Sequence, residues 1–229
     1  MSAASPRLPA RSALMLLCAA WLAAAQAQPC DGTPQTREAT SRQIRDFVRA
    51  SGKQLITFVG YSGAGYEDPA AMRAAAEQVL AGYDPARTLV NIGGTAAGIG
   101  EVYALAKRRG FATLGIVSSL ARDGGEPLSP CVDQVFFVRD ASWGGRAPGS
   151  KRLAPTSAAI VANSHALIGI GGGEIARDEL LAARAAGKPV RFVPADMNHA
   201  AARDKARAKG QSEPVDFRGA AHASLAPPR

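Results

Sequence analysis

The feature that most limits the fold of this chain is a repeated alternation between short apolar runs and amphipathic stretches. Runs rich in Val, Ile, Leu and Phe have the length and composition of buried strands, and they occupy residues 55–60, 88–94, 112–119, 132–140, 165–173 and 188–195. Most stretches between them carry apolar residues at helical spacing. Strands without a polar face, separated by helices, are typical of a parallel sheet that is covered on both sides. The sequence therefore predicts an α/β fold with a single doubly wound parallel sheet of about six strands and helices on both faces.

The beginning of the chain is typical of a secretory signal peptide. Residues 1–27 have a basic start, an apolar stretch and small residues at the end. The alternative is a start codon placed upstream of a cytoplasmic protein. Export would make the protein periplasmic or secreted, and Cys18 would leave with the signal. Cys30 and Cys131 would then remain in an oxidising compartment, which favours a disulfide between them over two free thiols.

The rest of the chain divides by composition. Residues 28–53 form a leader with one short amphipathic helix, residues 54–199 form the Rossmann-like domain, and residues 200–229 form a flexible basic tail that contains proline. The formal net charge of +8 depends largely on the two ends of the chain, so the domain itself is only mildly basic. Because no aromatic-rich basic face stands out, we expect no specific nucleic-acid partner. We also expect no membrane association after signal removal, no cofactor, and no metal site, since the cysteines and histidines are scattered.

Three glycine-bearing turns follow predicted strands at the edge where parallel sheets bind ligands. They are Gly60-Tyr61-Ser62-Gly63, Gly93-Gly94-Thr95 and Gly171-Gly172-Gly173, the last of which is followed by Glu174. Glycine lets backbone N–H groups approach a phosphate, and a helix N-terminus adds partial positive charge. One such turn would also serve as a tight strand–helix connection, but three at one edge predict a phosphate-bearing ligand. Their spacing fits neither the dinucleotide-binding nor the Walker pattern, which disfavours an ordinary dehydrogenase or ATPase.

The order of these elements resembles the SLOG superfamily, which includes the Lonely Guy phosphoribohydrolases and the DNA-processing protein DprA. Residues 92–102 align without a gap with the second-strand glycine motif of the Lonely Guy enzymes. Residues 171–179 occupy the place of their Pro-Gly-Gly-x-Gly-Thr-x-x-Glu motif, and residues 187–190 resemble their turn into the last strand. The resemblance implies the family fold over residues 54–198, a nucleotide-like small molecule on the glycine turns, and a homodimer as a plausible assembly.

The residues that would cut a nucleotide are only partly present. The resemblance implies that Glu179 is the catalytic carboxylate that stabilises the ribosyl oxocarbenium. However, Ile175-Ala176 stand where the family has Gly-Thr, and Thr156 stands where it has an arginine, for which Arg152 is the candidate substitute. Three functions stay open: a nucleotide-binding protein without hydrolase activity, a phosphoribohydrolase, and a Rossmann-like scaffold that binds another protein. The lost motif residues favour binding.

Two further features border the predicted pocket. Glu101 and Glu174 are other acids near it, although a glutamate in the first turn of a helix also complements the helix dipole. Residues 141–152 form a polar, glycine-rich loop. This loop would be either a lid, in which Trp143 stacks on a base, or a solvated loop.

Overall fold

A seven-stranded parallel sheet forms the centre of the molecule. The structure, a computed structural model, describes Met1 and residues 30–225. The strand order is β1-β5-β4-β3-β2-β6-β7, and every neighbouring pair runs parallel. The strands are β1 (Gln35–Glu38), β2 (Gln54–Gly60), β3 (Thr88–Asn91), β4 (Ala112–Ser118), β5 (Gln134–Val138), β6 (Ala166–Ile170) and β7 (Val190–Val193). The predicted parallel α/β fold is confirmed.

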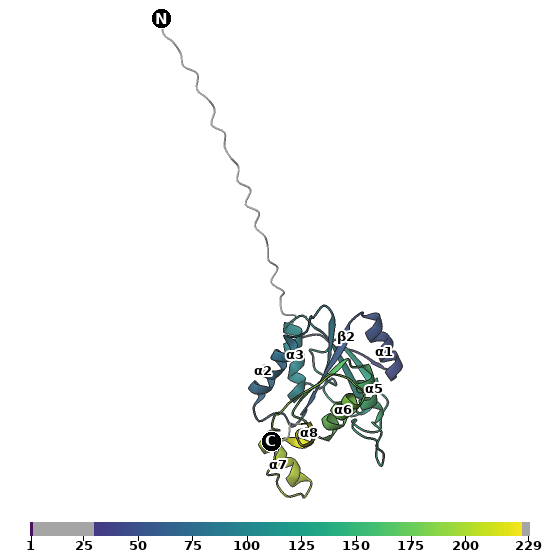
Figure 1. Cartoon of the computed structure of the whole chain (residues 1–229), viewed down its shortest axis with the longest axis vertical. Helices are drawn as coiled ribbons and strands as arrows, with labels where there is room; N and C mark the ends of the chain where they lie inside the picture. Colours follow the sequence, from purple (N-terminus) through teal and green to yellow (C-terminus); the bar gives the residue numbers. More distant parts are fainter. Residues whose placement is uncertain (2–29, 226–229) are drawn as a thin grey trace.

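Helices cover both faces of this sheet. They are α1 (Ser41–Ala50), α2 (Pro69–Leu80), α3 (Val102–Arg108), α4 (Ser119–Asp123), α5 (Pro155–Asn163), α6 (Glu174–Ala185), α7 (His199–Ala208) and α8 (Gly219–Leu225), with the short 3-10 helix η1 (Gly98–Glu101) before α3. Helices α2 and α3 pack together on one side of the sheet, and α1, α5 and α6 pack on the other (Figure 1). Each side has its own buried apolar cluster, because the strand side chains alternate between the two faces.

The leader contributes a strand that the sequence pattern does not predict. All four residues of β1 are exposed, and β1 extends the sheet at its edge by pairing with β5. A polar edge strand of this length has no apolar alternation from which it could be recognised. The predicted amphipathic helix that follows is α1, in which Ile44 and Val48 are buried. Thr40 caps this helix in a capping box with Gln43.

The predicted disulfide between Cys30 and Cys131 is present. The two Cα atoms lie 4.4 Å apart, and the bond joins positions that are separated by 101 residues. Cys131 is buried, and Cys30 packs against the core cluster on the α2–α3 side. The bond therefore ties the start of the leader to the loop that precedes β5.

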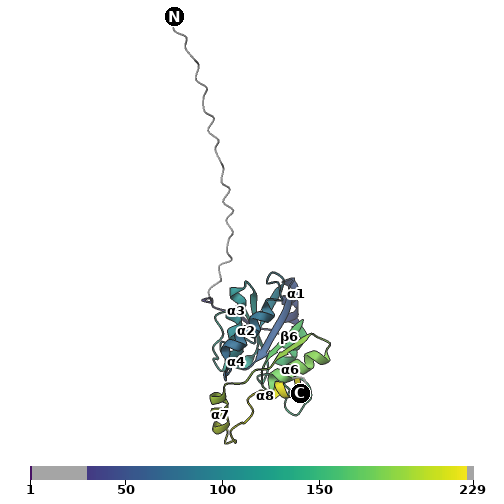
Figure 2. The same cartoon turned by 60° about the vertical axis from the view of Figure 1, so that its left-hand side comes forward.

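The C-terminal part of the chain, which the sequence predicts as a flexible tail, contains the helices α7 and α8. Figures 1 and 2 show α7 standing out from the body of the molecule at the same end as α8. Ala221 and Leu225 of α8 are buried against α6, beside Leu180 and Ala183. The sequence does not predict this packing, because α8 has seven residues and only two of them are buried, which is too few to show an apolar face. The predicted signal peptide lies outside the described residues, and within residues 30–225 no helix is both long enough and apolar enough to cross a membrane.

Candidate functional site

The three glycine turns lie next to one another at the carboxyl edge of the sheet. They follow β3, β2 and β6, which are consecutive in the strand order. From β2 the chain adds β3, β4 and β5 in one direction, and it then returns to place β6 on the other side of β2. The strand order thus reverses between β2 and β6. In open α/β sheets such a reversal is the usual place for a ligand.

Close backbone contacts join the turns to one another. A Cβ atom at Gly98 would lie 2.3 Å from the carbonyl oxygens of Tyr61 and Ser62. A Cβ atom at Gly172 would lie 3.6 Å from the Cα of Gly60. The first turn therefore contacts the third turn and the start of η1, which follows the second turn, and Gly98 is required by this packing.

Each turn has at least one backbone N–H group that is not used by the fold. The N–H groups of Ser62, Gly63, Thr95 and Gly173 make no hydrogen bond to any other described residue. Ser62 and Gly63 are exposed, whereas Thr95 and Gly173 are partly buried. A Cβ atom at Gly63 or Gly173 would meet no other atom within 4 Å. The fold therefore leaves these N–H groups without an acceptor among the described residues.

Other backbone groups predicted to bind the ligand are already occupied. The hydroxyl of Tyr103, which is completely buried, accepts hydrogen bonds of 3.0 Å from the N–H groups of Ile92 and Gly94. The same hydroxyl donates to the carbonyl oxygen of Leu114 at 2.7 Å. The N–H of Gly93 makes a longer contact of 3.4 Å to the side chain of Asn91. The N–H of Gly94 is therefore used in a hydrogen bond within the fold.

The side chain of Tyr61 is turned away from any ligand. Its ring is buried, and its hydroxyl donates a hydrogen bond of 2.7 Å to the carbonyl oxygen of Arg218. Its own N–H donates to the hydroxyl of Tyr66, which in turn donates to the carbonyl oxygen of Ile170 at 2.7 Å. A Cβ atom at Gly60 would lie 2.0 Å from that Tyr66 hydroxyl. Gly60 and Tyr61 therefore hold the turn, and Ser62 and Gly63 face outward.

Glu179 is buried between α5 and α6 and has a serine as its partner. Its exposed fraction is 3%, and the hydroxyl of Ser157 donates a hydrogen bond of 2.6 Å to its Oε1. The N–H of Gly145 donates to the same hydroxyl oxygen at 2.7 Å. Burial raises the pKa of Glu179 to about 7, and the neighbouring charge of Asp178 acts in the same direction, while the Ser157 hydrogen bond opposes them.

The glycine-rich loop that contacts Ser157 is a small hairpin. Its strands are held by hydrogen bonds from Ala147 N–H to the Arg152 carbonyl at 2.9 Å and from Ala154 N–H to the Gly145 carbonyl at 2.8 Å. A Cβ atom at Gly145 would lie 3.3 Å from the side chain of Ile175, so the hairpin rests on the first turn of α6. Trp143, just before the hairpin, is 51% exposed.

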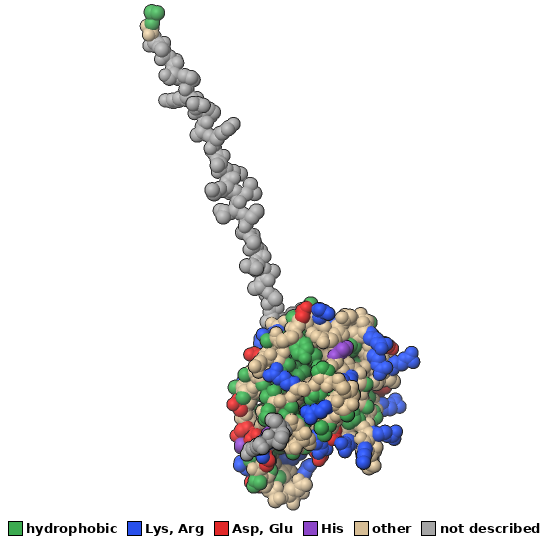
Figure 3. Space-filling model, viewed as in Figure 1, with side chains coloured by type: hydrophobic (Ala, Val, Ile, Leu, Met, Phe, Trp, Pro, Cys, Tyr) green, Lys and Arg blue, Asp and Glu red, His purple; other side chains and the backbone are tan. Residues whose placement is uncertain are grey.

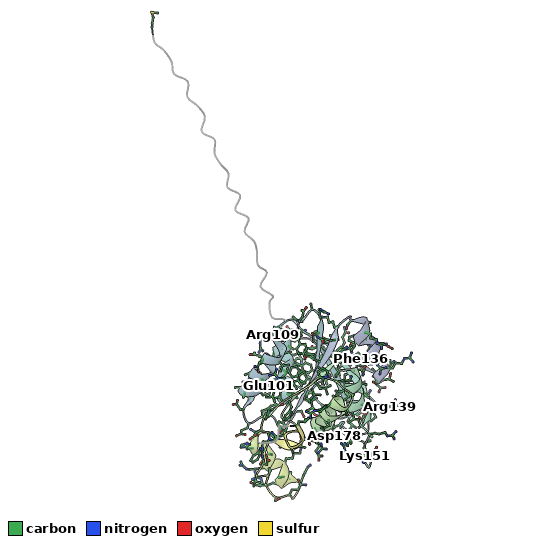
Figure 4. The ribbon with its side chains drawn as sticks, in the orientation of Figure 1. Glu101, Arg109, Phe136, Arg139, Lys151 and Asp178 are labelled. Atoms are coloured by element: carbon green, nitrogen blue, oxygen red, sulfur yellow. A yellow bond between two sulfur atoms is a disulfide. The ribbon has the colours of Figure 1, made fainter. Side chains whose placement is uncertain are left out.

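The predicted pairing of Glu179 with a basic residue of this hairpin is not formed. Arg152 is exposed and forms no ion pair with any described residue. Lys151 lies at the margin of the molecule where Lys and Arg side chains gather (Figures 3 and 4). Glu101 lies on the opposite side, where it pairs with Arg73 of α2 at 2.7 Å (Figure 4).

The remaining acid near the turns is Glu174, the first residue of α6. Its side chain is 82% exposed and approaches Arg177 at 4.0 Å. A surface pair of this kind contributes little to stability. Among residues 30–225, no group of three or more His, Cys, Asp or Glu side chains is placed to hold a metal ion.

Comparison with known proteins gives structural matches only. No family model and no curated protein matches the sequence. The X-ray structure of TM1055 is 23% identical with a TM-score of 0.43, covering 60% of this chain and 72% of that one. The Moco carrier protein from Chlamydomonas reinhardtii is 20% identical with a TM-score of 0.44, covering 75% and 94%. The molybdenum cofactor binding protein from Rippkaea orientalis is 21% identical with a TM-score of 0.44, covering 61% and 76%.

Proposed function

We propose that the protein binds a small phosphate-bearing molecule, a nucleotide or nucleotide derivative, on the three glycine turns. The observation that carries this proposal is the set of unused N–H groups at Ser62, Gly63, Thr95 and Gly173, which come from three adjoining turns at the point where the strand order reverses. Several N–H groups at one edge form the kind of site in which backbone donors hold a phosphate.

The surroundings of Glu179 favour binding over hydrolysis. A carboxylate that stabilises a ribosyl cation must touch the sugar, yet Glu179 is only 3% exposed, and the hairpin contacts its partner Ser157 through the N–H of Gly145. Its hydrogen-bond partner is Ser157 instead of an arginine. The disulfide between Cys30 and Cys131 supports the predicted export, because such bonds persist mainly in oxidising compartments.

A nucleoside monophosphate is expected to raise the melting temperature of the protein. At 100 times its Kd, a ligand that binds only the folded state adds about 2.7 kcal/mol to the free energy of unfolding. In Gly173→Ala, the new methyl group would stand in open space and obstruct the approach of a phosphate to the N–H groups. Since a hydrogen bond to a charged group contributes about 1.5–3 kcal/mol, we expect binding at least about tenfold weaker than in the parent.

The matched control for this measurement is Gly32→Ala, which also places a methyl group in open space. It should bind like the parent protein. Equal binding by Gly173→Ala and Gly32→Ala would contradict the proposed site. The proposal fails if no nucleoside monophosphate changes the melting temperature and mass spectrometry finds no copurifying ligand. A scaffold that binds another protein would then be the better explanation.

A second function, phosphoribohydrolase activity, is favoured by one observation. A carboxyl group with a pKa of about 7 suits proton transfer near neutral pH. We nevertheless expect that incubation with nucleoside monophosphates releases no free base above the level of a protein-free blank, as measured by chromatography. Release that is present in the parent and lost in Glu179→Gln would show that the protein is a hydrolase.

A further inference from the structure

We propose that Trp143 and Ile175 form an apolar surface that binds an aromatic ring of the phosphate-bearing ligand. This inference rests on the proposed function and concerns the part of the ligand that the glycine turns do not hold. It also gives a role to the glycine-rich loop, residues 141–152, which contributes no donor to the phosphate site. The term apolar surface is used below for these two side chains.

Exposed large apolar side chains are few in this protein. Among the described residues they are Met1, Trp143, Ile175 and Val215, and their exposed fractions at the second and third positions are 51% and 40%. Trp143 and Ile175 come from different segments, the glycine-rich loop and the first turn of α6, which the hairpin brings together. Neighbouring exposed apolar side chains mark a ligand or partner site more often than single scattered ones do.

The backbone of the hairpin places Trp143 close to Ile175. A Cβ atom at Gly144 would lie 3.5 Å from the side chain of Ile175, and one at Gly145 would lie 3.6 Å from its Cα atom. Because consecutive Cα atoms are about 3.8 Å apart, the Cα of Trp143 lies within about 9 Å of the Ile175 side chain. The indole of Trp143 is long enough to cover this distance.

The backbone is held on both sides of Trp143. Before it, the N–H and the hydroxyl of Ser142 both donate hydrogen bonds of 2.9 Å to Oδ1 of Asp140. After it, the N–H of Gly145 donates to the hydroxyl of Ser157 at 2.7 Å. The loop is therefore a fixed wall beside α6, and its position does not depend on closure over a ligand. A ring that is already in place loses less conformational freedom when it binds a partner.

The apolar surface adjoins the third glycine turn. Ile175 follows Gly173 by two positions, and the N–H of Gly173 makes no hydrogen bond to any other described residue. Two Cα–Cα steps span at most about 7.6 Å, a distance that the sugar of a nucleotide can bridge. A phosphate on Gly173 can therefore extend its ring over Ile175 toward Trp143. Since every base has an aromatic face, such a surface accepts different bases.

The charges around the apolar surface are balanced. The side chain of Asp178 is 5% exposed and pairs with Arg177 at 2.9 Å and with Arg146 of the hairpin at 3.5 Å. Glu174, which is 82% exposed, approaches the same Arg177 at 4.0 Å. Two arginines thus face two carboxylates, and we expect no net repulsion of a phosphate from this part of the molecule.

The test compares ligands with and without an aromatic ring, using the full chain. Loss of stacking between a base and an aromatic side chain weakens binding by about 5- to 150-fold. We therefore expect Trp143→Ala to bind adenosine 5′-monophosphate at least about fivefold more weakly than the parent, as measured by calorimetry. Ribose 5-phosphate has the sugar and the phosphate but no base, and its affinity should be the same for both proteins.

Two further substitutions keep the test decisive if Trp143→Ala folds poorly. Trp143→Phe retains an aromatic face and should keep most of the affinity for adenosine 5′-monophosphate. Trp143→Leu retains an apolar side chain without such a face and should weaken binding. The matched control is Val215→Ala, which shortens an apolar side chain that is 98% exposed and lies outside the turns. Equal affinity in the parent, Trp143→Phe and Trp143→Leu would overturn the apolar surface.

Fluorescence separates this inference from the proposed function. The chain has two tryptophans, and the difference in emission between the parent and Trp143→Phe isolates Trp143 from Trp21. A base that stacks on an indole quenches its emission, so adenosine, which has no phosphate, should quench Trp143 at higher concentrations than adenosine 5′-monophosphate does.

Each pattern of results identifies which proposal is wrong. If adenosine 5′-monophosphate raises the melting temperature but neither quenches Trp143 nor binds Trp143→Leu more weakly, the apolar surface is wrong and the binding function survives. If adenosine quenches Trp143 and the phosphate adds no affinity, the phosphate site is wrong and the apolar surface survives. If neither compound changes the melting temperature or the emission, both are wrong.

Discussion

Replacing Glu179 with glutamine is expected to stabilise the protein by about 3 kcal/mol at pH 8 and to leave its stability nearly unchanged at pH 4. In the folded protein the pKa of Glu179 is raised from 4.5 to about 7, chiefly by burial. One pKa unit corresponds to about 1.4 kcal/mol, so a shift of this size corresponds to about 3 kcal/mol. Glutamine keeps the shape of the side chain and an oxygen that can accept the hydrogen bond from Ser157.

The sign follows from the protons that each state binds. Below pH 4.5 the carboxyl group is protonated in both the folded and the unfolded chain, so it carries no penalty. Between pH 4.5 and 7 the unfolded chain loses this proton first, and the folded state becomes progressively less stable. Above pH 7 both states are ionised and the penalty is complete. The gain from Glu179→Gln should therefore appear across this window.

Urea unfolding at pH 4, 6 and 8 would measure the effect, and Glu174→Gln supplies the control. Glu174 belongs to the same helix but is 82% exposed. The Glu174→Gln variant loses only the favourable interaction between this charge and the helix dipole. Its free energy of unfolding should therefore fall by no more than about 0.3–1 kcal/mol, the usual size of that interaction at an exposed position. An equal effect of Glu179→Gln at pH 4 and pH 8, or destabilisation at pH 8, would show that the carboxyl group has another partner when it is ionised.

Most of the sheet could be predicted because its central strands are buried on both faces. In β2, five consecutive residues from Leu55 to Val59 are buried, and β6 is buried throughout. Such runs identify parallel strands even in a single sequence. The exposed strand β1 lacks this signal, and its place beside β5 depends on pairing with residues about 100 positions away, such as Thr36 with Val135.

The site was predictable only at the level of the backbone. Because parallel strands end at a common edge, the turns after β2, β3 and β6 had to meet there. The use of the Gly94 amide by the hydroxyl of Tyr103 depends on a side chain that reaches back from the following helix, and no motif marks such a contact. The C-terminal contact with Tyr61 comes from Arg218, which is 157 positions away.

The pKa and the burial of Glu179 were the least predictable features of the site, because they depend on which residues pack around its side chain. The Lonely Guy motif that residues 171–179 resemble has a glutamate at this position, but the sequence alone does not tell whether a substrate or the protein itself lies over it. Gly144 and Gly145 provide the only local signal. Both adopt positive φ angles, and a Cβ atom at Gly144 would lie 2.7 Å from the Ser157 hydroxyl. A pair of glycines before a short turn is thus a sign of a hairpin that packs closely on its neighbours.

Removing the disulfide is expected to have the other large effect on stability. Changing Cys30 to serine and Cys131 to alanine frees the leader from the loop before β5, and it releases a constraint between positions that are 101 residues apart. In the chain-entropy model, closing a loop of this length contributes about 4–5 kcal/mol, mainly by restricting the unfolded chain. The free energy of unfolding of the double variant, measured by urea unfolding, should therefore be lower by this amount, with hydrogen exchange in β1 accelerated most.

Reduction of the parent protein provides the control, because it breaks the same bond without a substitution. Dithiothreitol should lower the stability of the parent close to that of the double variant and should leave the variant unchanged. A loss of less than about 1 kcal/mol in the free energy of unfolding in both cases would contradict the entropic explanation. It would mean either that the leader stays close to the loop before β5 in the unfolded chain without the disulfide, or that the leader contributes little to the fold. A large loss would make correct folding depend on an oxidising compartment, which links the stability of the fold to the predicted export of the protein.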